Sequence, residues 1–106
     1  MYLYHATTRE RLASIQEQGL LVSKADPDAR VLAIWLHTSS HSAWAVLHTI
    51  RKHQAQLEEV VVLKVRISSG LVHFRKGLWY TRHDVPASCI GAVVPGSIFG
   101  GSAIRY

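Results

Sequence analysis

The sequence has a single cysteine, Cys89, among its 106 residues. One thiol cannot form an internal disulfide, so the fold must rely on packing rather than on covalent cross-links. Because Cys89 stands in an apolar stretch, we interpret it as a small buried side chain rather than as a nucleophile.

Long hydrophobic runs are also missing. No stretch of eighteen apolar residues occurs, and the first residues do not combine a basic segment with an apolar run. The sequence therefore predicts neither a membrane-spanning helix nor a secretory signal, and we expect a cytoplasmic protein with no membrane partner. Hydrophobic residues make up 48% of the chain, which is enough for a core, and no repeat or linker interrupts it. We predict one domain over residues 1–106.

Carboxylates are scarce, since seven Asp and Glu residues stand against twelve Lys and Arg residues, giving a net charge of +5. A basic domain attracts polyanions, because binding releases counterions from their phosphates. The basic residues are dispersed along the chain. The charge therefore suits a dinucleotide, a nucleic acid or simple solubility, and does not separate these possibilities.

Several well-known site motifs are absent. The chain has no glycine-rich phosphate-binding loop of the P-loop or Rossmann type, no Cys-x-x-Cys pair and no Gly-x-Ser-x-Gly motif. His37 and His41 straddle an expected helix start, and His48 and His53 are five residues apart. The first pair does not lie within one helix and the second is not four residues apart, so neither places two imidazoles on one helix face and we predict no metal site.

The first twenty residues read as one strand–helix unit. Side chains alternate over Tyr2–Ala6, as in a strand. Thr7 followed by Glu10 three residues later matches a capping box, and Gly19 is a typical helix end. His5 and Thr7 would then lie at a helix N-terminus, where backbone N–H groups suit a ribose or a phosphate. The alternative is that His5 is an ordinary strand histidine and Thr7 only a cap.

The middle of the chain predicts a second strand–helix step and a central strand. Residues 31–37 form a short apolar run, and Ser39 or Ser40 would cap a helix over residues 41–56. Its expected buried stripe is Trp44, Leu47 and Ile50, with Ala43 and Val46 beside them. Residues 58–67 are the clearest strand, and its odd-numbered apolar residues share one face. That face consists of Val61, Leu63, Val65 and Ile67, with Lys64 and Arg66 opposite, among Val60 and Val62.

Shorter strands are expected at residues 71–75, 78–81 and 89–94, separated by turns at 68–70 and 76–77. The carboxyl-terminal tail reads as irregular, with Ile98, Phe99 and Ile104 packed back onto the core. Because the strands gather in the second half of the chain, the pattern favours an α+β fold over alternating βαβ units.

The segment Tyr4-His5-Ala6-Thr7-Thr8, followed by Gln18-Gly19-Leu20, resembles the opening of the ADP-ribosyltransferase superfamily, nearest to its RNA 2′-phosphotransferase-like and DNA-modifying branch. The resemblance implies two small antiparallel or mixed sheets flanked by two helices, with NAD as a substrate in the cleft between them. It implies that His5 hydrogen-bonds a ribose of NAD and that Thr7, with Tyr4 and Ala6, shapes the pocket. Ala6 stands where the family has glycine.

A second segment, Trp35-Leu36-His37-Thr38-Ser39, resembles the family's next strand-to-helix step. The resemblance implies that His37, Thr38, Ser39 and Trp44 line the nicotinamide or phosphate side of the pocket. Core packing is the alternative for Trp44.

A third segment, residues 77–81 and 84–90, resembles the family's late strand. Many transferases have a glutamate there, which stabilises the oxocarbenium-like transition state as nicotinamide leaves. Here the position falls near Gly77 or Leu78, and the nearest carboxylate is Asp84. The resemblance to these transferases therefore implies that Asp84 interacts with the developing charge. Tyr80 would stack on a base or fill the sheet.

The RNA 2′-phosphotransferase branch also lacks that glutamate and sets arginine and histidine residues against a phosphate. The resemblance to this branch implies a site made of His5, His37 and Arg75. Two activities therefore stay open: transfer of ADP-ribose from NAD to a protein or nucleic acid, and an NAD-using RNA 2′-phosphotransferase reaction.

The other hypothesis is a non-catalytic basic module that binds a nucleotide, a nucleic acid or a partner protein. The basic residues that would form such a surface are Arg51, Lys52, Lys64, Arg66, Arg75 and Lys76. A phosphate-driven binder would lose affinity steeply as salt rises, whereas an NAD pocket would depend on His5.

Overall fold

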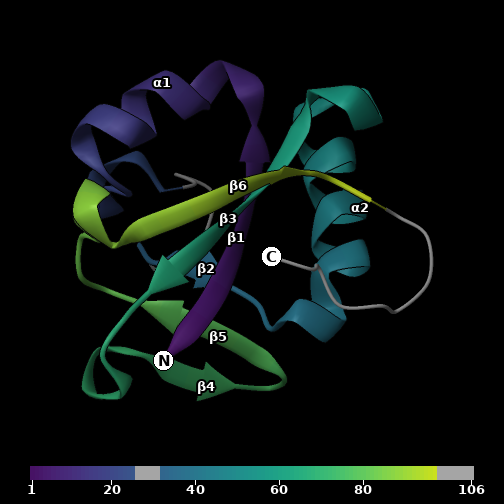
Figure 1. Cartoon of the computed structure of the whole chain (residues 1–106). Helices are drawn as coiled ribbons and strands as arrows, with labels where there is room; N and C mark the ends of the chain where they lie inside the picture. Colours follow the sequence, from purple (N-terminus) through teal and green to yellow (C-terminus); the bar gives the residue numbers. More distant parts are fainter. Residues whose placement is uncertain (26–31, 98–106) are drawn as a thin grey trace.

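Two helices and two three-stranded antiparallel sheets make up the computed structural model, which describes residues 1–25 and 32–97 (Figure 1). The elements are β1 (Tyr2–Thr8), α1 (Arg9–Gln18), β2 (Ile34–Leu36), α2 (Ser42–His53), β3 (Val60–Arg66), β4 (His73–Arg75), β5 (Leu78–Thr81) and β6 (Ile90–Pro95). The α+β prediction is confirmed. The expected packing of Ile98, Phe99 and Ile104 lies outside the described residues.

The first sheet has the order β1-β3-β6, so β3 is its central strand. Its two faces separate as the alternation predicted. Val61, Leu63 and Val65 belong to a core that also includes Leu3 of β1 and Ile15 of α1. The opposite face places Val60 and Val62 against Val46 of α2, and all three are fully buried. The two helices therefore cover different parts of one sheet (Figure 1).

The second sheet has the order β2-β5-β4 and is smaller. A two-residue turn joins β4 to β5, and both of its residues have positive φ, 52° at Lys76 and 82° at Gly77. Turns of this kind match the right-handed twist of the strands that they join. The predicted break at 76–77 is confirmed.

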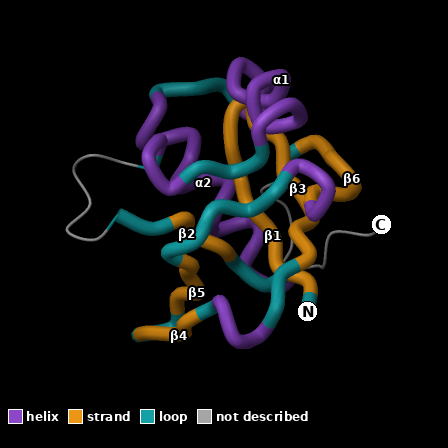
Figure 2. Tube along the Cα trace, turned by 90° about the vertical axis from the view of Figure 1, so that its left-hand side faces the viewer, coloured by secondary structure: helices purple, strands orange, loops and turns teal. Residues whose placement is uncertain are grey.

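Two backbone hydrogen bonds join the sheets. The Tyr4 N–H donates to the His37 carbonyl and the His37 N–H donates to the Tyr4 carbonyl, both at 2.8 Å. This bridge places the middle of β1 beside the end of β2, as the side-on view shows (Figure 2). It brings together two segments that are more than thirty residues apart in the chain.

Helix α1 begins later than predicted. Thr7 is a strand residue opposite Val61 and is only 3% exposed, so the expected capping box with Glu10 is wrong. The N-cap is Thr8, without a side-chain cap hydrogen bond. Sheet pairing, which satisfies the backbone of Thr7, outweighs the local capping signal. The predicted end at Gly19 is confirmed, since its N–H donates to the Ile15 carbonyl at 2.7 Å.

Helix α2 buries a face that matches the predicted one only in part, since Val46 is fully buried and Ile50 packs beside it. Its buried residues are Ser42, Ala45, Val46 and Thr49, whereas Trp44 is 53% exposed. The N-cap is His41, after a 3₁₀ turn at Ser39–His41, so capping by Ser39 or Ser40 is also wrong. Small and β-branched side chains allow the helix to approach the sheet closely, and the large ring is left at the surface. Within the described ranges no helix is long and apolar enough to cross a membrane.

Two glycines with positive φ allow a matched stability test. A Cβ on Gly19 would lie 2.1 Å from the Val85 carbonyl oxygen, whereas a Cβ on Gly77 would meet nothing within 4 Å. Gly77→Ala should lower the free energy of unfolding by about 1 kcal/mol, the cost of a left-handed backbone conformation at a residue with a side chain. Gly19→Ala adds a backbone clash and should lower the free energy of unfolding by about 3 kcal/mol or more. Urea titration measures both variants, and equal losses would contradict the clash.

Candidate functional site

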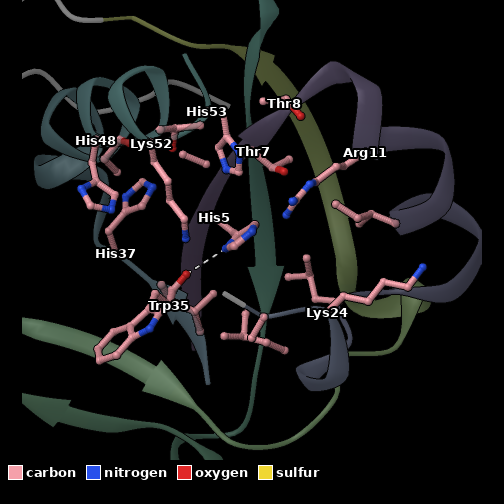
Figure 3. A pocket seen from close by; sticks show the side chains of 18 of the residues that line it. His5, Thr7, Thr8, Arg11, Lys24, Trp35, His37, His48, Lys52 and His53 are labelled. Atoms are coloured by element: carbon pink, nitrogen blue, oxygen red, sulfur yellow. Dashed lines mark hydrogen bonds between the residues drawn. The ribbon is translucent and has the colours of Figure 1, made fainter. Parts of the chain in front are cut away.

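A cavity with a volume of about 750 Å³, which we call the large cavity, lies between β1, α1, α2 and β2 (Figure 3). The second half of β1 forms one wall, with His5, Ala6, Thr7 and Thr8. The two helices and β2 supply the other walls, including Arg11, Trp35, His37, Trp44, His48 and Lys52. A cavity of this size suits a drug-sized or nucleotide-sized ligand.

His5 is held by a backbone carbonyl. Its Nδ1 lies 2.8 Å from the carbonyl oxygen of Trp35 (Figure 3). A carbonyl can only accept, so in the neutral ring Nδ1 carries the hydrogen and Nε2 carries a lone pair. Burial, together with the nearby His37, Arg11 and Lys52, lowers the pKa of His5 from 6.5 to about 4. His5 is therefore neutral at pH 7 and has one hydrogen-bond acceptor to offer.

Positive charge surrounds His5. Lys52 extends from α2 and Arg11 from α1, and both side chains reach toward the imidazole in Figure 3. Lys24 also lines the cavity, and the carboxylates in the lining are Glu10 and Glu59. A concave, partly desolvated site with this charge balance attracts anions. The guanidinium of Arg11 can also bind a phosphate through two hydrogen bonds.

His37 has an unsatisfied nitrogen. Its Nδ1 lies 2.8 Å from the Thr38 carbonyl oxygen, so Nδ1 donates in the neutral ring and Nε2 is an acceptor. The residue is 7% exposed, and in the described part of the chain its Nε2 has no hydrogen-bond partner. Burial lowers the pKa of His37 as well. A buried acceptor without a donor costs about 1–3 kcal/mol, which a bound donor group would recover.

His37 also lines a second, smaller cavity of about 140 Å³. Thr38, Trp44 and Trp79 are among its other walls. The Thr38 hydroxyl lies 2.9 Å from His41 Nδ1, which fixes the start of the 3₁₀ turn. Trp44 lines both cavities, and its ring stacks on His48 with centroids 5.5 Å apart.

The structure brings together part of the predicted site. His5, Ala6, Thr7, His37 and Trp44 all line the large cavity. Two more predicted residues lie beside it. Tyr4 stacks on His37 with centroids 6.1 Å apart, and Thr38 lines the small cavity. Ser39 lies in the turn before α2 and lines neither cavity.

Three other predicted residues lie elsewhere. Arg75 is exposed on β4, and Tyr80 lies on β5, packed against the Trp35 ring. Asp84 accepts a hydrogen bond from the Val22 N–H at 2.8 Å and so anchors the segment after α1. None of the three lines either cavity. The predicted grouping of His5, His37 and Arg75 is not formed.

The sequence interpretation missed Arg11 and the cavity role of Lys52. A signal for Lys52 was present, since Trp44, His48 and Lys52 recur every four residues and share one helix face. The sequence gives no such signal for Arg11, because the direction of its side chain depends on the angle between β1 and α1.

No protein-family model matches the chain, and a search of curated proteins finds no match. The resemblance to ADP-ribosyltransferases therefore rests on the residues quoted for it. Within residues 1–25 and 32–97, no three His, Cys, Asp or Glu side chains are grouped so that they could hold a metal ion.

The lowered pKa of His5 predicts a pH dependence of stability. The unfolded chain takes up a proton on His5 near pH 6.5 and the folded chain only near pH 4, so the free energy of unfolding falls as pH drops through this window. His37 contributes in the same direction. His5→Gln should reduce the slope by up to one proton, about 1.4 kcal/mol per pH unit. Denaturant titrations from pH 4 to 7 measure it.

The matched control is His83→Gln, in an exposed loop outside the cavity. It should keep the wild-type slope. An unchanged slope in His5→Gln would show that His5 is not held neutral by the fold.

Proposed function

We propose that this protein is an NAD-using transferase of the ADP-ribosyltransferase-like kind, with the large cavity as its NAD site. The observation that carries the proposal is the neutral His5, whose Nε2 is an acceptor in a 750 Å³ cavity flanked by Arg11 and Lys52. A ligand that combines hydroxyl donors with negative charge satisfies both features. A dinucleotide has ribose hydroxyls and a pyrophosphate, and this combination supports NAD.

The two ends of the cavity suit different parts of NAD. Arg11 and Lys52 would bind the pyrophosphate, and His5 Nε2 would accept from a ribose hydroxyl. His37 Nε2 would accept from the carboxamide of nicotinamide, which is a donor group of the right kind for a buried acceptor. Trp44, which lines both cavities, supplies a ring beside that end.

NAD would supply a C1′–nitrogen bond whose electron pair leaves on nicotinamide, while the acceptor atom would bond to C1′ and release its proton to water. The residues of this chain would hold the ribose and the pyrophosphate in place and exclude water. Asp84 and Arg75 lie outside the cavity, so we assign them no step. The charged groups that line the cavity are Arg11, Lys24 and Lys52, with Glu10 and Glu59 as carboxylates.

The same residues also support the related RNA 2′-phosphotransferase activity. Arg11 and Lys52 would hold a phosphate without a catalytic glutamate, while Nε2 of His5 and Nε2 of His37 would accept from hydroxyl groups of the ligand. Arg11 and Lys52 would then contact the phosphate, the role that the family resemblance implied for Arg75. An assay of nicotinamide release from NAD separates the two activities by the acceptor that it needs, which is either a 2′-phosphorylated RNA or an unmodified macromolecule.

NAD binding should depend on the Nε2 position of His5. His5→Asn keeps a side-chain donor for the Trp35 carbonyl but has no atom where Nε2 stood. Calorimetry with wild type and His5→Asn should show saturable binding that weakens about tenfold in the variant. His83→Asn, outside the cavity, is the matched control and should bind like wild type. The absence of binding at millimolar NAD would overturn the proposal.

The charge near His5 predicts a different pattern. Arg11→Gln should weaken NAD binding about tenfold but leave nicotinamide riboside, which has no phosphate, unaffected. Arg9→Gln is the control, since Arg9 donates to the Glu58 carbonyl and does not line the cavity. Equal weakening for both ligands would contradict a pyrophosphate contact. Binding without any release of nicotinamide would identify a non-catalytic nucleotide-binding module instead.

A further inference from the structure

The outer face of the β2-β5-β4 sheet carries a continuous row of rings. Trp35 pairs with Tyr80 across β2 and β5, and Tyr80 pairs with His73 across β5 and β4. The ring centroids are 5.2 Å apart for Trp35–Tyr80 and 5.1 Å for Tyr80–His73. We refer to these three residues as the aromatic row. It crosses all three strands of the sheet.

The aromatic row faces away from the protein core. The alternate residues of β2, Ile34 and Leu36, are buried in the core, so Trp35 lies on the opposite face. Trp35 is 39% exposed, and Leu78, which shares this face, is 37% exposed. Apolar side chains that lie together on one exposed face can form an interaction site.

The charge on this face has one sign. Arg75 pairs with Leu78 and shares the face with His73, and Lys76 follows in the turn to β5. The strands β2, β4 and β5 contain no Asp or Glu, and the nearby Asp84 is bonded to the Val22 N–H. Rings and positive charge on one face suit a partner that is flat and anionic.

From this combination we propose that the aromatic row binds a single-stranded polynucleotide. Bases would stack on Trp35, Tyr80 and His73, while Arg75 and Lys76 contact phosphates. An exposed β-sheet with stacked rings and flanking cations is a known way to bind single strands, because every base has a π-face. A duplex hides its bases and would gain only the phosphate contacts.

The row begins at the rim of the large cavity, because Trp35 and Leu78 also line that cavity. A polynucleotide bound along the aromatic row would therefore bring one of its nucleotides to the mouth of the large cavity. The inference does not depend on NAD binding, and it gives a role to Tyr80 and Arg75, which the cavity does not use.

The test is fluorescence anisotropy with a fluorescein-labelled twelve-residue oligothymidine, without NAD. Wild type should bind it saturably, and bind the matched duplex less tightly at the same salt. Tyr80→Ala should weaken binding about tenfold. The matched control is Phe74→Ala, because Phe74 is 60% exposed on the other face of the same sheet and packs on Trp79. It should stay within about twofold of wild type.

A salt series gives an independent readout. Arg75→Gln should reduce the slope of log affinity against log salt by about 0.7, the value for one phosphate contact on a single strand. Arg51→Gln, an exposed arginine on α2, should leave the slope unchanged. His73→Ala at the edge strand serves as a second stacking variant if Tyr80→Ala does not melt cooperatively.

Three outcomes would overturn the inference: no saturable binding by wild type, equal weakening by Tyr80→Ala and Phe74→Ala, or equal affinity for single strand and duplex. The face would then belong to a protein partner. The oligothymidine titration contains no NAD and the NAD calorimetry contains no oligothymidine, so failure of the NAD proposal and failure of this one are told apart.

Discussion

Three hydrogen bonds between β1 and the end of β2 join the two sheets and position the candidate site. Two are the reciprocal backbone bonds of Tyr4 and His37, and the third runs from His5 Nδ1 to the Trp35 carbonyl. They fix one sheet on the other and fix the imidazole of His5 at the same time. Because consecutive strand residues point to opposite faces, Tyr4 packs toward α2 while His5 lines the cavity. A shift of one residue in this bridge would exchange the two side chains and remove the site.

The bridge also determines the protonation of the cavity. It holds the half-buried His5 near Arg11 and Lys52, where a further positive charge is unfavourable, and the loss of contact with water itself opposes charging. A carbonyl at Nδ1 leaves the lone pair on Nε2. The same logic applies at His37, whose Nδ1 is bonded to the Thr38 carbonyl. Two neutral acceptors in a cationic cavity form an environment in which a ligand gains by bringing both donors and negative charge.

Local pattern predicted much of the fold and less of the site. Strand β3 was predictable because apolar residues that alternate with period two indicate a strand. The helix end at Gly19 was predictable because glycine readily adopts the positive φ found there. The face of α2 was misread, since small residues, rather than Trp44, approach the sheet. His5 and His37 were correctly named, but Arg75 and Asp84 were grouped with them on the order of segments alone. Contact between distant segments depends on the bridge between the sheets, which no local pattern encodes.

The causes of the low pKa of His5 decide whether it can act with a ligand in place. An anion between Arg11 and Lys52 would offset their charges and raise the pKa of His5. Burial is the largest cause of the shift, however, and the coulombic effects of His37, Arg11 and Lys52 are smaller. A ligand that fills the cavity displaces water and therefore strengthens the burial effect while it weakens the coulombic one. His5 should thus remain a neutral acceptor near pH 7 in the complex, bound to the ligand through Nε2 rather than charged beside it.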